Sequence, residues 1–327
     1  MERTRHESPA KQVQLCVVGM SSTGYLNIEP HTLRKYNILK KYLEVCKKFD
    51  KHYSNFVYVD THGGSGKVNL NGQWVQGSPL IAAEWTPSFP CHIVEIDPAI
   101  YRCLCKSTSG HTNVNLYHGD CNAKINSILA AIPQGQKFVF CFVDPTKLVY
   151  SGRDDVECDQ LCADTVKKIA GFPRSELLLN FPLESILRCA GDYLKNPTEP
   201  RAIGSGARVT TFMGSAGWQA ISWSETHFER NRSAFLEAYM NEVLGRYQYK
   251  GAFLVRTQQN NLPVYYLVYG TKNRVAAEIM RSIMKTEYID AIGYTPLTRL
   301  QYTTDKEWLD AEYPLNRPFI FENLSVA

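Results

Sequence analysis

The sequence predicts an α/β fold, namely a doubly wound, mostly parallel seven-stranded sheet with an antiparallel edge strand. Five apolar runs alternate with helical patterns, as in proteins whose parallel strands are joined by helices. Residues 137–144 are apolar almost without interruption, which is typical of a parallel strand covered on both faces. Two later runs, at 252–256 and 263–269, flank a turn-rich segment and predict an antiparallel pair.

Start and stop signals define the elements of the first half. Thr32 is an N-cap residue type at the head of a helical pattern. A strand over 55–60 then runs into a glycine-rich turn. Residues 68–75 predict a hairpin around Asn71-Gly72, and a helix opens at Ser78, which a proline follows.

The remaining elements complete the alternation. Further strands are expected at 91–97, 114–117 and 176–182. Helices are expected at 125–132, 158–170, 186–194, 233–247 and 275–284.

The alternation of predicted strands and helices also suggests a domain organisation. We expect an N-terminal arm (1–30), one domain over 31–290 and a C-terminal tail (291–327). Within the domain, residues 184–250 depart from the alternation and are expected to form an insertion or lid. Its segment 201–217 is rich in glycine, serine and arginine, and either a mobile lid or a surface loop with core aromatics fits it.

Composition excludes several classes of protein. Hydrophobic residues make up 44% of the chain and charged residues 21%, which is ordinary for a globular protein. The net charge of +4 is no strong polyanion-binding signature. The first residues are polar and no run suits a membrane helix, so we expect a cytoplasmic protein with no membrane contact and with its ten cysteines reduced. The cysteine spacings do not predict a metal site.

The glycine turn over 60–66 does not fit a dinucleotide fingerprint. That fingerprint opens a helix directly, so that the helix N-terminus receives a pyrophosphate. Here the glycines follow an acid, Asp60, and the next predicted helix begins only at Ser78. The turn is therefore expected to approach a ligand without phosphate.

Three acids lie at the carboxyl ends of three successive predicted strands: Asp60, Glu95 and Asp120. Ligands of doubly wound sheets gather at this edge. S-adenosylmethionine offers an ammonium group, a sulfonium, a ribose diol and an adenine amine to such acceptors. The set predicts that cofactor and the sheet of class I methyltransferases, whereas the alternative is a group of loop-capping carboxylates.

Asp144-Pro145 follows the fourth strand, where methyltransferases acting on amino groups place an acid or amide before proline. A carboxylate there can accept hydrogen bonds from an amine, although a plain strand-ending turn is equally consistent. Asn180 after the fifth strand has the same ambiguity. His62, inside the glycine turn, is a candidate general base, with cofactor stacking or loop capping as alternatives.

These motifs together resemble the three-Cys-motif partner family, bacterial and phage proteins with a methyltransferase-like fold. The resemblance is carried by residues 60–66, by 77–82, by Gly119-Asp120 with Asn122, by Asp144-Pro145 and by 180–182 with Arg188. Phe212 and Trp218 match a later element, whereas Thr146-Lys147 departs from the family's Phe-Gly. The resemblance implies cofactor contacts for Gly64, Gly66, Ser78 and Asn122, and a partner protein bearing a three-cysteine motif.

The sequence thus predicts an S-adenosylmethionine-dependent methyltransferase acting on a nucleic acid or nucleotide-like substrate. Basic and aromatic residues are what base stacking and phosphate contact require, so Asn180, Arg188, Phe212 and Trp218 are the substrate candidates. A small-molecule methyltransferase and a non-catalytic, cofactor-binding subunit of a phage or defence complex remain open. A nicotinamide enzyme is disfavoured because of the delayed helix.

Overall fold

The computed structural model describes residues 25–49, 56–85, 87–133, 137–151, 157–292 and 304–322. Most of the predicted N-terminal arm therefore lies outside the described residues. Within them, no helix combines the length and the apolar character needed to cross a membrane.

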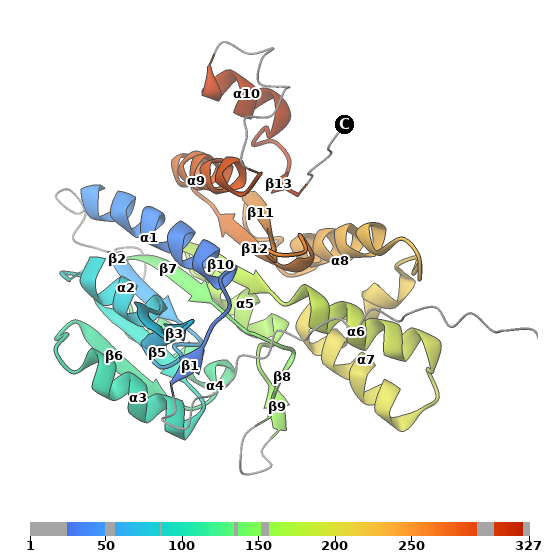
Figure 1. Ribbon diagram of the computed structural model, residues 1–327, viewed down its shortest axis with the longest axis horizontal. Coiled ribbons are helices and arrows are strands. Elements are labelled where there is room, and N and C mark those ends of the chain that lie inside the picture. The colour runs from blue at the N-terminus through green and yellow to red at the C-terminus, as the bar shows by residue number, and fades with distance from the viewer. Residues whose placement is uncertain are drawn as a thin grey trace, which may run out of the picture.

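One large sheet of eight strands organises the described chain (Figure 1). Its spatial order is β13-β11-β12-β10-β7-β2-β5-β6. In chain order the bounds are β2 Phe56–Asp60, β5 Cys91–Glu95, β6 Val114–His118, β7 Phe138–Val143, β10 Ser175–Phe181, β11 Tyr249–Arg256, β12 Pro263–Thr271 and β13 Phe319–Phe321.

This sheet confirms the predicted fold class and corrects two of its details. Seven strands were expected, but β13 adds an eighth by pairing in parallel with β11. The antiparallel strand was expected at the edge, but β12 lies inside the sheet, antiparallel to both β10 and β11. The reason is that β11 does not pair with β10, and β12 occupies the position between these two strands. The order of the seven predicted strands, 3-2-1-4-5-7-6 along the sheet, is that of class I methyltransferases.

Helices cover both faces of the sheet, so each face has its own apolar core. One face packs against α4 (Cys121–Ala131), α5 (Ala163–Gly171) and α6 (Leu183–Lys195), and the core extends to α7 (Pro200–Met213) and α8 (Phe228–Glu242). The other packs against α1 (Thr32–Phe49), α2 (Ser78–Trp85), α3 (Pro98–Thr108), α9 (Arg274–Ile292) and α10 (Asp305–Glu312). β7 and β10 are buried almost throughout because both faces are covered.

The predicted hairpin after the glycine turn is confirmed. β3 (Lys67–Leu70) and β4 (Gln73–Gln76) meet at a two-residue turn in which Asn71 and Gly72 have φ of 50° and 87°. Positive φ at both positions is the type I′ requirement that Asn-Gly satisfies. β1 (Leu26–Asn27) pairs in parallel with β3, so that the hairpin becomes a small three-stranded sheet.

The helix expected over 158–170 begins later than predicted. α5 starts at Ala163, and residues 157–159 form β9, which pairs with β8 (Val149–Ser151). Cys158 therefore lies in a strand and Cys162 at the helix N-cap, and the two do not share a helix face as the sequence suggested.

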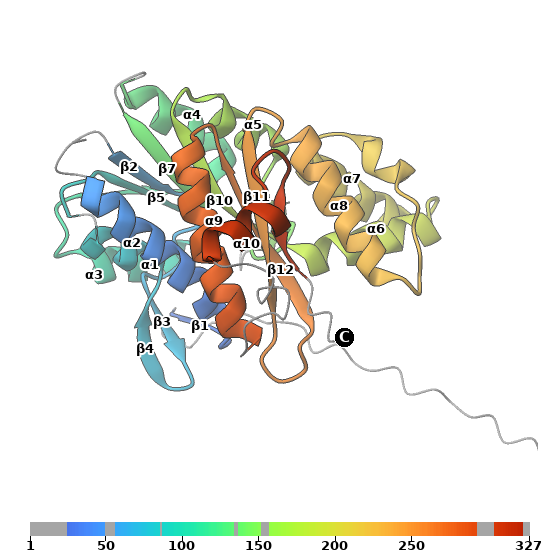
Figure 2. The same cartoon turned by 90° about the horizontal axis from the view of Figure 1, so that it is seen from above.

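The segment at 201–217, expected to be a lid or loop, is mostly the helix α7, followed by a short 3₁₀ helix at Ala216–Ala220 (η1). With α6 and α8 it forms a helical lobe at one end of the molecule (Figure 2). Val209 and Met213 are buried in the core. Tertiary packing thus overrides the glycines, which in isolation disfavour a helix.

Candidate functional site

A cleft of about 290 Å³ opens at the carboxyl ends of β2, β5, β6 and β7. Parallel strands deliver their C-terminal residues to the same edge, so the predicted acids meet there. Of the residues predicted from the sequence, the cleft is lined by His62, Gly64, Ser78, Glu95, Asp120 and Asp144. Eight other predicted residues are not among the lining residues: Asp60, Gly66, Asn122, Pro145, Asn180, Arg188, Phe212 and Trp218.

The glycine turn is packed directly against β5. A Cβ on Gly63 would lie 2.4 Å from Ile93 Cγ2, so a side chain cannot be accommodated there without displacement. Gly64 has a φ of 62°, and its N–H donates to Glu95 Oε2 at 2.8 Å. Glycine is thus required both for the close approach and for the left-handed backbone that aims this N–H at the acid.

Asp60 ends β2 beneath the cleft and is fully buried. Its carboxylate accepts hydrogen bonds from the His62 backbone N–H and the Tyr58 hydroxyl, both at 3.1 Å. Burial raises the pKa of Asp60 to about 7, although hydrogen bonds from Ser78 and the His62 backbone oppose the shift. Asp60 thus supports the glycine turn through its hydrogen bond with the His62 backbone N–H.

Glu95 ends β5 and binds the backbone on both sides of the cleft. Its two oxygens accept from the N–H groups of Gly64 and Asp97, each at 2.8 Å. Burial raises the pKa of Glu95 to about 7, against the effect of these hydrogen bonds. The side chain therefore fixes the glycine turn relative to the next loop.

Asp97 lines the cleft beside Glu95, and the sequence analysis did not single it out. Its Oδ1 caps α3 by accepting from Ala99 N and Ile100 N, and its Oδ2 accepts from the Tyr150 hydroxyl at 3.0 Å. Its position directly before Pro98 is a helix N-cap signal that could have revealed it.

Asp120 is the N-cap of α4 and accepts from the backbone N–H of Asn122 at 2.8 Å. The Asn122 side chain turns away toward α5. Its amide donates to Asp120 Oδ1 and to Asp159 O, and its oxygen accepts from Cys162 N and the Thr165 hydroxyl. Asn122 thus ties α4 to α5, while Asp120 lines the cleft.

His62 has both ring nitrogens engaged by the protein. Nε2 lies 3.1 Å from the carbonyl oxygen of Gln160, which can only accept, so this nitrogen carries the proton. Nδ1 then accepts from the Thr61 hydroxyl at 2.8 Å. Burial lowers the pKa of His62 and favours this neutral form. His62 thus joins the glycine turn to residue 160, and its role as a general base stays a prediction.

Asp144 at the end of β7 carries a buried ion pair with Lys35, with 2.5 Å between Nζ and Oδ2. Asn180 Nδ2 donates to the other carboxylate oxygen at 2.8 Å, while Asn180 Oδ1 is buried with no hydrogen-bond partner among the described residues. Lys35 comes from α1, far away in the sequence, and it also lines the cleft. The sequence analysis did not single out Lys35, because lysines recur along this helix and no local signal distinguishes this one.

The turn after Asp144 is fixed by Gln160. Its side-chain oxygen accepts from the backbone N–H groups of Thr146 and Lys147, at 2.8 and 3.1 Å. Pro145 is buried within this turn. The backbone at 146–147 is therefore held by a residue from the β9–α5 connection.

Phe212 and Trp218 lie in the core and not at the cleft. Both are about 2% exposed or less. Phe212 stacks on Tyr239 with ring centroids 4.9 Å apart, and the Trp218 indole donates to Thr210. Arg188 is exposed on α6. The expected aromatic platform for a base is therefore absent from the 201–217 segment, because those rings fill the interior of the helical lobe.

The charge of the cleft suits a cationic ligand. Among the described residues that line it, four are acids (Glu95, Asp97, Asp120 and Asp144) and two are lysines (Lys35 and Lys147). The N-termini of α3 and α4 are capped by the side chains of Asp97 and Asp120, which accept from Ala99 N, Ile100 N and Asn122 N, and these two negative charges disfavour a phosphate there. The lining carboxylates are hydrogen-bond acceptors, which suit a ligand with cationic or hydroxyl groups. The described residues hold no cluster of metal-ligand side chains.

Comparisons with known proteins yield weak similarities. No family model and no curated protein matches the chain. Among solved structures, it is similar to LPL1258 of Legionella pneumophila str. Philadelphia 1, assigned to DUF519, with 13% identity over 77% of this chain and 90% of that one (TM-score 0.44).

Two further similar structures have methyltransferase names. A protein from Thermobifida fusca YX described as a methyltransferase is 14% identical over 74% of this chain and 82% of its own (TM-score 0.38). The O-methyltransferase TomG of Streptomyces achromogenes, solved with S-adenosylmethionine, is 9% identical over 72% and 79% (TM-score 0.36). These values do not assign a family, and the fold assignment rests on the strand order described above.

Proposed function

We propose that this protein is an S-adenosylmethionine-dependent methyltransferase that acts on an amino group of a nucleic acid or nucleotide-like substrate. The observation that carries the proposal is the convergence of the glycine turn, Glu95, Asp97, Asp120 and Asp144 on one cleft at the carboxyl edge of a 3-2-1-4-5-7-6 sheet. The bound cofactor would supply an electrophilic methyl group.

The residues of the cleft would divide the work of binding. Glu95 and Asp97 lie after the second strand and would accept hydrogen bonds from the ribose diol. Asp120, after the third strand, would accept from the adenine amine. Gly64 and Ser78 would hold the amino-acid end, and the buried Asp60 would contribute indirectly, through the glycine turn that it supports. Gly66 and Asn122 contribute indirectly, since they shape the turn and the α4–α5 connection.

Asp144 would orient the acceptor amine. Lys35 holds one carboxylate oxygen and Asn180 the other, which keeps the group fixed at the cleft wall. Carboxylate oxygens have further lone pairs that can accept from an amine N–H. Catalysis would thus depend on proximity and orientation, with the amine proton passing to Asp144 or to water.

Two other functions remain as proposals. A small molecule bearing an amine would satisfy the same acceptors. The three-Cys-motif partner resemblance, carried by motif residues such as Gly77-Ser78 and Asp144-Pro145, favours a non-catalytic cofactor-binding subunit whose partner bears a three-cysteine motif.

Calorimetry with S-adenosylmethionine and with its demethylated product tests the cofactor assignment. We expect binding to the wild type and a loss of at least about tenfold in affinity for Asp120→Ala, since one charge-assisted hydrogen bond contributes ~1.5–3 kcal/mol. The matched control is Asp164→Ala, an acid in the first turn of α5 that does not line the cleft. The absence of binding at millimolar ligand would rule out the proposed methyltransferase function.

Incubation of a nucleic-acid pool with methyl-labelled cofactor tests the reaction. We expect transfer by the wild type and a loss of at least about a hundredfold for Asp144→Asn with cofactor binding retained. Label that appears only in small molecules would favour the small-molecule alternative. Binding without transfer to any acceptor would favour the non-catalytic subunit.

A further inference from the structure

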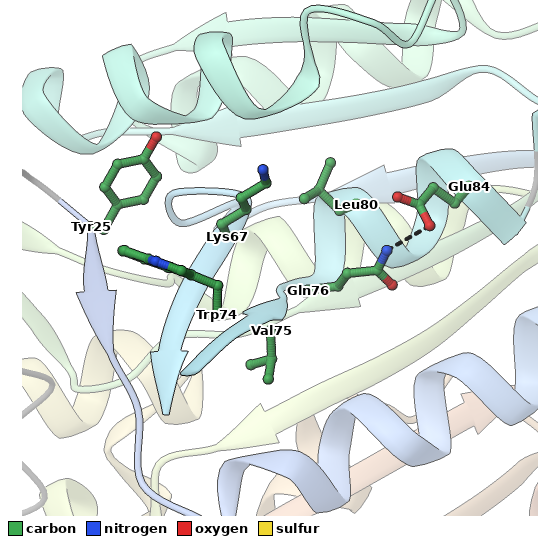
Figure 3. Close-up of a pocket in the computed structure, with 7 residues that line it drawn as sticks. All are labelled: Tyr25, Lys67, Trp74, Val75, Gln76, Leu80 and Glu84. Atoms are coloured by element: carbon green, nitrogen blue, oxygen red, sulfur yellow. Dashed lines mark hydrogen bonds between the residues drawn. The ribbon is translucent and has the colours of Figure 1, made fainter. Parts of the chain in front are cut away.

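A second pocket lies beside the cleft, on the small sheet formed by β1, β3 and β4 (Figure 3). It has a volume of about 440 Å³ and is lined by Tyr25, Lys67, Trp74, Val75, Gln76, Leu80 and Glu84. Trp74 is 57% exposed, which is unusual for the largest apolar side chain. None of these residues has a role in the proposed methyl transfer.

The strand register explains how this pocket relates to the cleft. Lys67 pairs with Gln76 and Asn69 with Trp74, so the side chains of Lys67, Trp74 and Gln76 project from the same face. Leu26 and Val68 pair with each other and line the cleft on the opposite face. The pocket and the cleft are thus the two faces of one small sheet.

Trp74 is held in place by its neighbours. Tyr25 packs edge-on against it, with ring centroids 5.0 Å apart and planes at 68°. Figure 3 shows the two rings together, with Lys67 beside them and Val75 pointing away. On the other side of the pocket Gln76 donates to Glu84 at 2.5 Å. An exposed indole next to a lysine is an arrangement on which nucleobases of single strands stack, with the cation near the phosphate.

We infer that this pocket is a stacking site for a base of a single-stranded nucleic acid, a more distant nucleotide of which enters the cleft on the other face of the small sheet. The inference rests on the proposed function and names its substrate class. It also relocates the aromatic platform, which the sequence predicted at Phe212 and Trp218, to the hairpin inserted between the glycine turn and α2. Trp74 stacks on the base, and Lys67 contacts the adjacent phosphate.

Binding of labelled single-stranded RNA and DNA of about ten nucleotides, within the usual site sizes, tests the inference. Trp74→Ala is expected to weaken binding about tenfold or more, because stacking contributes ~1–3 kcal/mol per base. Trp74→Phe keeps an aromatic face and is expected to remain within about threefold of the wild type. The matched control is Phe228→Ala, an equally exposed (57%) aromatic on α8 outside both pockets.

Two further measurements separate the contributions. Lys67→Ala is expected to reduce the slope of log affinity against log salt by about 0.7, the value for one phosphate contact with a single strand. Tryptophan fluorescence of the wild type is expected to be quenched on binding, and this quenching should be lost in Trp74→Phe. Nucleoside monophosphates in place of the oligonucleotide distinguish a strand from a free nucleotide, and equal affinity for a monophosphate and the strand overturns the inference.

The inference and the proposed function fail in different ways. Oligonucleotide binding that is unaffected in Trp74→Ala, or absent in the wild type, overturns the inference, even if the demethylated cofactor still binds. Conversely, if oligonucleotides bind in a Trp74-dependent manner but the cofactor does not bind, the stacking site is supported and the proposed methyltransferase function is overturned. If Trp74→Ala fails to fold, the fluorescence quenching of the wild type and its loss in Trp74→Phe still test whether a base stacks on Trp74.

Discussion

Asp60 and Glu95 show how burial tunes single residues of the cleft. Desolvation raises the pKa of each to about 7, so near neutral pH each carboxyl is divided between its charged and neutral forms. The backbone N–H groups that surround them favour the charged form, and at Glu95, which lines the cleft, they would be joined by hydroxyl groups of a ligand. The charge of the site is therefore sensitive to small changes in pH.

Cofactor affinity is predicted to rise with pH. If the carboxylate form of Glu95 is required, about a tenth of the sites are competent at about pH 6 and most at about pH 8, which corresponds to an about tenfold change in affinity. Calorimetry at the two pH values measures it. Glu95→Gln should bind weakly and lose the part of the pH dependence that the titration of Glu95 causes, and a dependence as steep as that of the wild type would contradict the assignment.

The Lys35–Asp144 ion pair is the other residue-scale feature, because both members are buried. Lys35→Met is predicted to destabilise the fold by ~3–5 kcal/mol, since it leaves a buried carboxylate without its cation. Urea unfolding measures the change. Lys48→Met, at an exposed position of the same helix, is the control and should stay within about 0.5 kcal/mol. Equal effects of the two variants would show that the pair contributes nothing.

At the scale of elements, α7 illustrates packing that outweighs propensity. Gly206 faces α6, where a Cβ would lie 2.6 Å from the Tyr193 ring. Gly204 in the same helix has open space around its Cα. The two glycines therefore have the same helix propensity and opposite surroundings.

This pair makes a matched prediction. Gly204→Ala should stabilise the protein by about 0.5–1 kcal/mol, because alanine favours the helix. Gly206→Ala should destabilise it by ~1–3 kcal/mol, because the added methyl group displaces Tyr193 and overpacks the α6–α7 contact. Thermal or urea unfolding of both variants measures the difference, and two effects of the same sign would contradict the described packing.

At the scale of the whole molecule, Glu176 joins distant parts of the chain. It lies in the middle of the sheet on β10 and accepts from Tyr42 of α1, and from Tyr269 and Thr271 of β12. Burial raises its pKa to about 7, against the effect of these hydrogen bonds. The folded protein thus holds the proton of Glu176 more tightly than the unfolded chain.

The sign of the resulting pH dependence follows from linkage. A raised carboxyl pKa contributes stability at low pH, and that contribution is lost as pH rises from about 4.5 to about 7. Glu176→Gln does not titrate, so its stability relative to the wild type should increase by about 2–3 kcal/mol between about pH 5 and pH 8. Urea unfolding at both pH values measures this, and a pH-independent difference would contradict the raised pKa.

Local patterns in the sequence determined much of the fold. The glycine turn, the Asn71-Gly72 hairpin and the N-terminal positions of α1 and α2 follow from short-range sterics and hydrogen bonding, which the residues themselves encode. The alternation of strands and helices determined the topology. The acids at the strand ends indicated where the cleft lies, because parallel strands bring their C-terminal ends to one edge of the sheet.

Only the tertiary structure decided which side chains meet. Lys35 pairs with Asp144 across 109 positions of sequence, and nothing near either residue indicates the contact. Phe212 and Trp218 look like a binding surface in the sequence and are core in the structure, whereas Trp74 is exposed. Burial depends on which elements pack together, and that is a property of the whole chain that a local pattern does not contain.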